Sequence, residues 1–483
     1  MTKKTTEKEL NPASPVDIKG ETLLPEDVTL SHLTDLWNMA ESEYVDITRK
    51  MTLLDAADTG EIWDYISRKF PDYQISPDTN HVNLVKSAIQ SSVYSVGKSA
   101  SLMPQRAEDQ EVVRKINSVL ERLWDVLEIS NYQMEAGERA ALLNLGITQV
   151  GWNPSTLSNG NGSWYKGDVA LKNIDPICFR RDPFSKKIDD GQFCGYYDFL
   201  PKVLLQGSPL YSERIKEIMR SDVEPPSTSS LSYKRNISSG AAAKDYYKIV
   251  YMWVKVPSYD ASGKANGTKI HEIHMIDTAY VLYVKEDIQP NEFPFAELYC
   301  NIPVKSPVGV SEPSRVLASS MVVNLLDGLM ATHAYKAQRP PRLINRDSGL
   351  NLRNFAKYGN DPDKVFTING RPDDVVKYIA FPTLPAEIPG LAARLDMNIE
   401  KTSGISETYT GNDTGSITTT GGIESMLAQA TARDVNKINN YESYAKQLTR
   451  LIISNLMAFS DKRTYMVPDV APPGEFLPIE VDF

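Results

Sequence analysis

The sequence predicts a mixed α/β protein, and the order of three patterns carries this prediction. Apolar residues recur at helical spacing in residues 31–145. Segments rich in β-branched and aromatic residues, joined by short polar turns, follow in residues 146–284. The helical period returns from residue 311. A chain of 483 residues with this order is expected to contain several structural units.

In the first half we expect three helices and two groups of strands. The helices lie near Ser31, over Asn83–Ser99 and over Glu108–Leu145, the last with a break at Ser130-Asn131. A strand from Gly146 to Trp152 precedes an expected strand pair, VALKNI and ICFRRD, which Asp175-Pro176 separates. The segments 246–256, 269–276 and 280–284 are expected to form an antiparallel meander.

The second half reads as helix, small β-module, helix, loop and long helix. Glu312-Pro313 begins the first helix, because proline is tolerated in a first helical turn. Asn369-Gly370 is a hairpin-turn signal within the module. Gly404 can end the second helix. The loop TGNDTGSITTTGGIE precedes a long run without glycine or proline, and four prolines predict that the last 23 residues are irregular.

The composition restricts the classes of function. A net charge of −10 and a pI near 5.3 argue against a protein that coats DNA with its whole surface. The three cysteines form no CxxC motif and are expected to be reduced thiols. Neither a signal-peptide core nor an apolar run of the roughly 20 residues that span a bilayer is present, so no membrane partner is expected.

The segment Val96-Gly97-Lys98-Ser99 resembles the end of a phosphate-binding P-loop. A complete motif needs glycine five residues before Gly97, where this chain has Ser92, and it follows a buried strand rather than a helical pattern. We therefore interpret the segment as a turn near a helix end. A nucleotide site that uses Lys98 remains the alternative.

Two further motifs favour structural roles over catalysis. His271 and His274 are three apart in a predicted strand, which places them on opposite faces and prevents a shared metal ion. Asp175-Pro176 and Asp182-Pro183 are typical of turns, because Asp caps its own backbone and Pro fixes φ. No catalytic residues, metal site or cofactor are predicted.

The loop of residues 410–424 does not fit a phosphate cradle. Between Lys401 and Arg433 the sequence contains neither Lys nor Arg, whereas a site that grips phosphate normally adds a cation. Glycines and hydroxyl groups dominate the loop. Such a surface can contact a polyanion without holding it.

An ordered series of segments resembles the portal (head–tail connector) proteins of tailed bacteriophages. The series covers roughly residues 75–460 and comprises GITQVGWNP with VALKNIDPICFRRDP, EFPFAELYCNIPVKSPVGVSEPSRVLASSMVVNLL, KAQRPPRLI, FTINGRPDDVVKYI, DMNIEKTSGISETYTG and TGSITTTGGIESML. Each segment alone is weak evidence, and their order and spacing carry the resemblance. The short chain after the long helix departs from members that have a large crown.

The resemblance implies a portal architecture and a ring oligomer. Its parts would be a flexible arm at 1–28, an α/β wing at 29–310, stem helices at 311–337 and 389–404, a small α/β clip at 338–388, a tunnel loop at 405–422, a long wing helix at 423–460 and a short or vestigial crown at 461–483.

The resemblance also implies a function without catalysis. The ring, expected to be a dodecamer, would sit at one capsid vertex of the virion after assembly in the host cytoplasm, and double-stranded DNA would be packaged and ejected through it. The implied partners are further copies of the chain, DNA, the terminase, head–tail adaptor or tail proteins and the major capsid protein. The short crown favours a short-tailed phage.

Two groups of candidate site residues follow from the resemblance. The DNA-tunnel loop would present Asn412, Asp413, Thr414, Gly415, Ser416, Ile417, Thr418, Thr419 and Thr420. Residues 338–377 carry eight basic and five acidic side chains in an otherwise acidic protein. The docking surface of the clip would use Arg342, Arg346, Arg353, Lys357 and Arg371. The alternatives are a nucleic-acid-dependent NTPase that uses VGKS and a non-viral helical scaffold.

Overall fold

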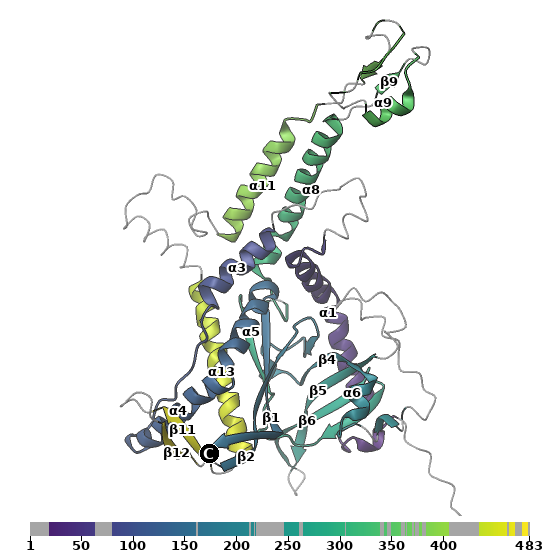
Figure 1. Ribbon diagram of the computed structural model, residues 1–483. Coiled ribbons are helices and arrows are strands. Elements are labelled where there is room, and N and C mark those ends of the chain that lie inside the picture. Colours follow the sequence, from purple (N-terminus) through teal and green to yellow (C-terminus); the bar gives the residue numbers. More distant parts are fainter. Residues whose placement is uncertain are drawn as a thin grey trace, which may run out of the picture. The chain divides into compact units, whose positions relative to one another are not determined.

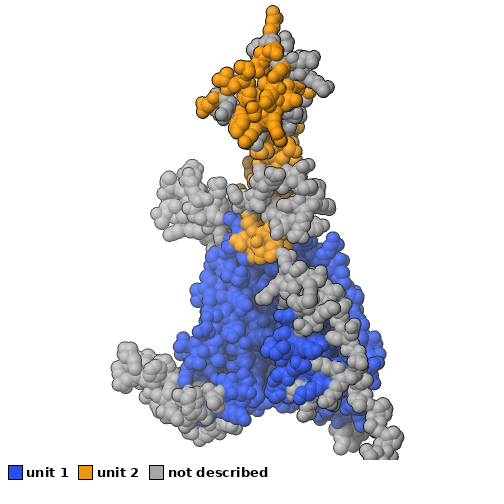
Figure 2. Space-filling view, turned by 45° about the vertical axis from the view of Figure 1, so that its right-hand side comes forward, with its two compact units in different colours: residues 1–55, 84–314, 407–483 blue, residues 56–83, 315–406 orange. Residues whose placement is uncertain are grey.

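The computed structural model describes most of the chain, as two compact units that Figure 2 colours separately. The described residues are 19–62, 80–160, 163–211, 214–216, 218, 246–259, 264–304, 306–338, 342–344, 349–358, 363, 365–369, 371, 376–378, 383–404, 434–460, 463–468 and 476–481. Unit 1 comprises residues 1–55, 84–314 and 407–483, and unit 2 comprises residues 56–83 and 315–406. Residues 56–83, expected within the wing at 29–310, therefore group with unit 2.

Unit 1 is built on two antiparallel sheets (Figure 1). The three-stranded sheet has the order β2-β1-β8, from β1 (Leu145–Gly160), β2 (Ser163–Ile174) and β8 (Phe295–Tyr299). The five-stranded sheet has the order β3-β4-β5-β6-β7, from β3 (Phe179–Arg181), β4 (Phe193–Pro201), β5 (Tyr246–Tyr259), β6 (Ala265–Ile276) and β7 (Tyr280–Lys285). The antiparallel meander expected in residues 246–284 is present as β5, β6 and β7.

One strand prediction is wrong. VALKNI and ICFRRD do not pair with each other, because VALKNI belongs to β2 and pairs with β1, whereas Phe179–Arg181 forms β3 and pairs with β4. A turn in which the amide of Cys178 donates to the carbonyl of Asp175 redirects the chain from one sheet to the other. The segment therefore links the sheets instead of forming a hairpin.

The helices of unit 1 lie where the helical period predicts them, except that α3 (His81–Val93) ends earlier than expected. They are α1 (Leu30–Asp58), α3, α4 (Gln110–Val126), α5 (Ile129–Leu143), α6 (Lys202–Gly207) and α13 (Val435–Phe459), with short 3-10 turns at Glu21–Leu23, Ala107–Asp109 and Ile188–Asp190. Only the last three residues of α1 and the first three of α3 belong to unit 2. Glu128, at a φ of 50°, separates α4 from α5 close to the expected break. Helix α3 ends at Val93, six residues before the expected Ser99.

Helices cover both sheets and create the core of unit 1. Leu33 and Trp37 of α1, 0% and 1% exposed, pack with Val250 and Met275 of the five-stranded sheet. Figure 1 shows α1 beside this sheet. On the three-stranded sheet, the buried Tyr444 hydroxyl of α13 lies 2.6 Å from Thr148 Oγ1 of β1. Burial of large apolar side chains supplies the main stabilisation of both layers.

A buried charge pair joins the two sheets. Arg181 of β3 donates from Nη1 to Glu297 Oε2 of β8 at 3.0 Å and from Nη2 to the carbonyl of Pro307 at 2.6 Å. Burial raises the pKa of Glu297, and Arg181 opposes that shift. Removing either partner would leave an uncompensated charge in the core, so the pair fixes how β3 and β8 lie relative to each other.

Unit 2 contains two long helices and a small module between them in sequence. Its elements are α8 (Glu312–Gln338), β9 (Arg342–Ile344), α9 (Leu352–Tyr358), β10 (Val376–Tyr378) and α11 (Glu387–Ser403). Gly404 ends α11 in the left-handed conformation at a φ of 75°, as the sequence indicates. The hairpin expected at Asn369-Gly370 is not formed by the described residues: 365–369 contain no strand, and β10 pairs with β9 instead.

The last residues of the chain are more regular than expected. β11 (Arg463–Pro468) and β12 (Phe476–Val481) form an antiparallel pair. Their prolines lie at Pro468, which ends β11, and at Pro478 within a two-stranded sheet. Each strand of such a sheet has a free edge, where a missing N–H group is tolerated.

Candidate functional site

The VGKS segment follows a bend after the end of α3 and docks against α5 and α13. The amide of Lys98 donates to Gln133 Oε1 at 2.9 Å, and Gln133 Nε2 donates to the carbonyl of Lys98 at 2.8 Å. Lys98 Nζ lies 3.0 Å from Glu442 Oε1. Gly97 is required by close packing, because a Cβ there would lie 2.4 Å from Ser130 Oγ. These contacts occupy the amide and the ammonium of Lys98, two of the groups that a P-loop would offer to phosphate.

The two histidines of β6 make separate contacts. Asp287 donates its amide to His271 Nδ1 at 3.1 Å. His274 lies between Tyr211 Oη at 2.7 Å and Glu272 Oε1 at 3.0 Å. Within the described part of the chain, no group of three His, Cys, Asp or Glu side chains is placed to hold a metal ion.

The Asp-Pro motifs cap turns, as the sequence indicates. Asp175 Oδ1 accepts the amide of Ile177 at 3.0 Å. Asp182 Oδ1 accepts the amide of Phe184 and Oδ2 accepts the amide of Gln192, both at 3.0 Å. Each carboxylate is used by nearby backbone amides, which gives it a structural role.

The expected tunnel loop, with all nine candidate residues from Asn412 to Thr420, lies outside the described residues. The chain is described again from Asp434, which directly precedes α13 and is 7% exposed. Asp434 Oδ1 lies 2.9 Å from Lys437 Nζ, and its Oδ2 accepts the hydroxyl of Ser92 at 2.9 Å. These contacts attach the start of α13 to the end of α3.

The basic residues of the small module are only partly described. Arg353 and Lys357 are exposed and one helical turn apart on α9, and Arg371 is also exposed. The buried Phe355 holds α9 against Phe366, with ring centroids 5.2 Å apart. Arg342 begins β9, but its side chain and all of Arg346 lie outside the described residues. The structure therefore brings two of the five candidates together.

Helix α8 is apolar but largely uncovered. Its most apolar window has a mean hydropathy of 1.2 and is 33% buried, which makes it the one described helix that could cross a membrane by length and composition. Val322, Leu329 and Tyr335 are 42%, 37% and 55% exposed. An exposed apolar surface of this kind is typical of a protein interface.

A histidine links the two long helices of unit 2. His81 Nδ1 lies 3.2 Å from Ser320 Oγ of α8, and its Nε2 lies 3.4 Å from Asp396 Oδ1 of α11. Burial lowers the pKa of His81, and Asp396 and Asp327 oppose this shift. The contact holds α8 and α11 at one point along their length.

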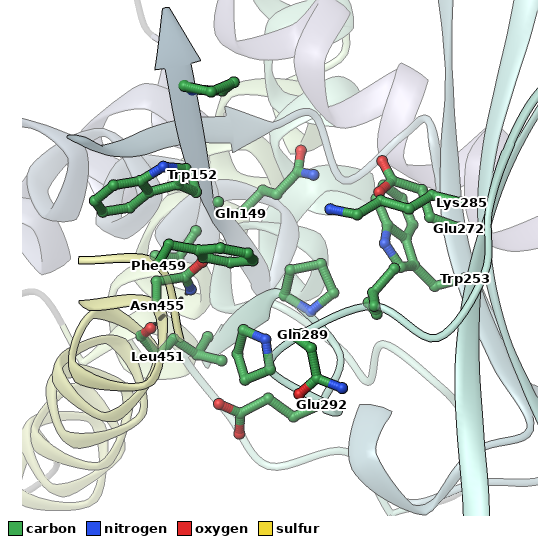
Figure 3. A pocket seen from close by; sticks show the side chains of 16 residues that line it. Gln149, Trp152, Trp253, Glu272, Lys285, Gln289, Glu292, Leu451, Asn455 and Phe459 are labelled. Atoms are coloured by element: carbon green, nitrogen blue, oxygen red, sulfur yellow. Dashed lines mark hydrogen bonds between the residues drawn. The ribbon is translucent and has the colours of Figure 1, made fainter. Parts of the chain in front are cut away.

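Unit 1 contains a cavity of about 500 Å³ that the sequence did not predict. Its walls come from β1, from the strands around Trp253, from the turn at Ile288–Pro294 and from the end of α13. In Figure 3, Trp152 and Phe459 lie on one side, and Trp253, Glu272 and Lys285 lie on the other. The only sequence signals were the Gly151-Trp152 pair and the QPNEFPF segment, which lie far apart along the chain.

Comparison with protein families identifies the chain. The model of the phage SU10 portal protein family matches residues 110–477. The chain belongs to this portal family. No curated protein matches the sequence significantly. A portal protein is a structural component of the phage capsid, so this portal chain acts in the virion rather than as an enzyme.

Proposed function

We propose that this portal protein forms a closed ring at one capsid vertex, through which double-stranded DNA is packaged and ejected. Wing, stem, clip and tunnel loop correspond to unit 1, to α8 with α11, to the β9–α9–β10 module and to residues 405–422. The ring is expected to be a dodecamer assembled in the host cytoplasm. Its partners are the terminase, then head–tail adaptor or tail proteins, and the major capsid protein.

The apolar surface of α8 carries this proposal. Val322, Leu329 and Tyr335 are exposed on a helix of which only a third of the apolar window is buried. Neighbouring copies in a ring would cover this surface, with the heterologous contacts that cyclic symmetry produces. A bilayer explains the helix less well, because Asn324 and Asp327 lie near its centre and charged groups are costly there.

Charge on this surface tests ring assembly. Val322→Asp and Leu329→Asp are expected to give monomers, because each carboxylate would be buried without a partner in the contact. Val112→Asp on α4, which is 57% exposed, is the matched control. Analytical ultracentrifugation and negative-stain images without detergent measure the outcome. Unchanged rings in both α8 variants would contradict the proposed contact.

The tunnel loop is proposed to let DNA slide. Residues 405–422 contain no Lys or Arg, so they offer few of the phosphate contacts that make DNA binding strong. Deleting residues 413–420 is expected to preserve the ring and to impair DNA packaging or retention. Packaging at the normal level would show that the loop is only a connector.

The basic side chains of the clip are proposed to dock an acidic surface of the terminase or adaptor. Arg353 and Lys357 point from one face of α9, and they act with Arg342, Arg346 and Arg371 of the same module. Arg342→Glu and Arg353→Glu are expected to weaken this binding more than tenfold, with Lys50→Glu on α1 as the control. Equal binding by all variants would refute the docking surface.

A further inference from the structure

The cavity of unit 1 is a built site with two aromatic sides. The rings of Trp152 and Phe459 are stacked with centroids 5.8 Å apart, and Trp253 lines the opposite wall. Lys285 Nζ lies 5.6 Å from the centre of the Phe459 ring. A ring face at that distance attracts a cation, so the Phe459 ring already interacts with the ammonium group of Lys285. A volume of about 500 Å³ is within the range of ligand pockets.

The carboxylates of the cavity exceed its cations. Glu272 and Glu292 line it, and Lys285 is the one cation among its described lining residues. Glu292 Oε2 contacts Arg450 at 3.3 Å, and this arginine is 55% exposed and is shared with Asp189. Such an exposed and shared pair is weak.

One oxygen of Glu292 lacks a partner. Its Oε1 atom is shielded from water and accepts no hydrogen bond from the described residues. A buried acceptor without a donor is destabilising, and more so when the group is charged. A cationic donor that enters the cavity would offset this cost. The aromatic walls favour a side chain with an apolar stem, and the unsatisfied carboxylate favours a positively charged end.

We propose that this cavity binds an arginine or lysine side chain presented by a peptide segment of a basic partner protein. Its aliphatic stem would lie between Trp152 and Trp253, and its charged end would pair with Glu292. Two carboxylates against one ammonium in the lining give the cavity a negative charge, which favours a cationic side chain as its occupant. The proposal does not depend on ring assembly.

Gly151 allows the cavity to be filled without disturbing the fold. It lies on β1 two residues from Gln149, on the same face of the strand, and a Cβ built there meets no atom within 4 Å. The φ of Gly151 is not in the left-handed region, so other residues fit its backbone. Gly151→Leu should therefore block the cavity while the thermal midpoint of unfolding is retained.

The test uses the full chain and two acetylated peptide amides, Gly-Arg-Gly and Gly-citrulline-Gly, titrated into the millimolar range by calorimetry. The arginine peptide is expected to bind at least tenfold more tightly than the uncharged citrulline peptide. Glu292→Gln should weaken arginine binding at least fivefold, and Gly151→Leu should abolish it. Glu121→Gln on α4 makes the same charge change outside the cavity and should have no effect.

Three results would overturn the proposal. Equal binding of the two peptides would show that the charge is not recognised. Arginine binding that survives in both Glu292→Gln and Gly151→Leu would place the peptide elsewhere. A lower oligomer mass for Gly151→Leu would show that a second copy occupies the cavity, rather than a partner protein.

Discussion

Lys98 and Glu442 lie 344 positions apart in the chain and form a 3.0 Å ion pair between the VGKS segment and α13. Both ends of the pair are partly exposed, at 31% and 49%. Lys98 Nζ also lies 5.8 Å from the centre of the Tyr441 ring. The lysine that looks like a phosphate ligand in the sequence therefore helps to attach the segment to the long helix.

Stability should depend more on Gln133 than on Lys98. Gln133 is 0% exposed and satisfies both backbone groups of Lys98. Gln133→Ala is expected to cost about 1–3 kcal/mol, since the two part-buried backbone groups of Lys98 lose their partners. Lys98→Ala should lower stability only slightly, because an exposed ion pair contributes little. Urea denaturation measures both variants.

The same lysine variant tests the NTPase alternative. Wild-type protein and Lys98→Ala should release the same background level of phosphate from ATP, with and without DNA. Glu442→Gln, which removes the other half of the ion pair, is the control for indirect effects on the segment. Turnover that requires Lys98 and survives in Glu442→Gln would restore the NTPase interpretation.

Loss of Asp434 should be costly where α13 begins. Asp434→Ala leaves the ammonium of Lys437, 7% exposed, without its carboxylate partner. Removing one member of a buried pair costs about 3–5 kcal/mol. The double variant Asp434→Ala/Lys437→Met should recover most of this loss, because no unpaired charge remains. A double variant no more stable than Asp434→Ala would argue against the charge as the cause.

The sequence predicted the elements with strong local signals. Apolar residues at helical spacing from Ser31 onward predicted α1, and Gly404 marked the end of α11, because these signals depend on neighbouring residues alone. The strand partners were less predictable. β10 pairs with β9 rather than across Asn369-Gly370, and β2 and β3 join different sheets. Pairing depends on contacts between distant residues, which a single sequence does not encode locally.

The candidate sites also divide into those with local sequence signals and those that depend on distant residues. Asp175 and Asp182 were predicted as turn caps. The prediction was possible because each accepts a hydrogen bond from an amide only two residues further along the chain. The cavity was not predicted, because Trp152, Trp253 and Phe459 come from three distant segments. In the sequence alone, these aromatic residues cannot be distinguished from ordinary core residues of a strand or helix. Only their convergence around Glu292 distinguishes them.

The thiols of the folded protein should be unreactive. Cys178, Cys194 and Cys300 are buried and form no disulfide. Burial raises the pKa of Cys194 well above its usual value and raises that of Cys300 to about 12, although Lys437 lowers the latter in part. Because the thiolate is the reactive form, Ellman's reagent at pH 8 should label none of them in the native protein and all three in guanidinium. Rapid native labelling would indicate local opening around these residues.

Stability of unit 2 should fall as the pH is lowered, through His81. Burial between α8 and α11 lowers the pKa of His81 below its value of about 6.5 in an unfolded chain. Between these two pKa values the unfolded chain binds more protons than the folded one. The stabilisation is therefore complete above about pH 6.5 and is lost as the pH falls towards the folded-state pKa.

The variant His81→Gln isolates this effect. Glutamine keeps a polar group near Ser320 and Asp396 but does not titrate, so the decline in stability between pH 7 and pH 5 should become shallower. His32→Gln on the exposed surface of α1 makes the same change away from unit 2. Hydrogen exchange of α8 and α11 against pH measures the local stability. An equal decline in wild type and His81→Gln would show that other groups destabilise the two helices at low pH.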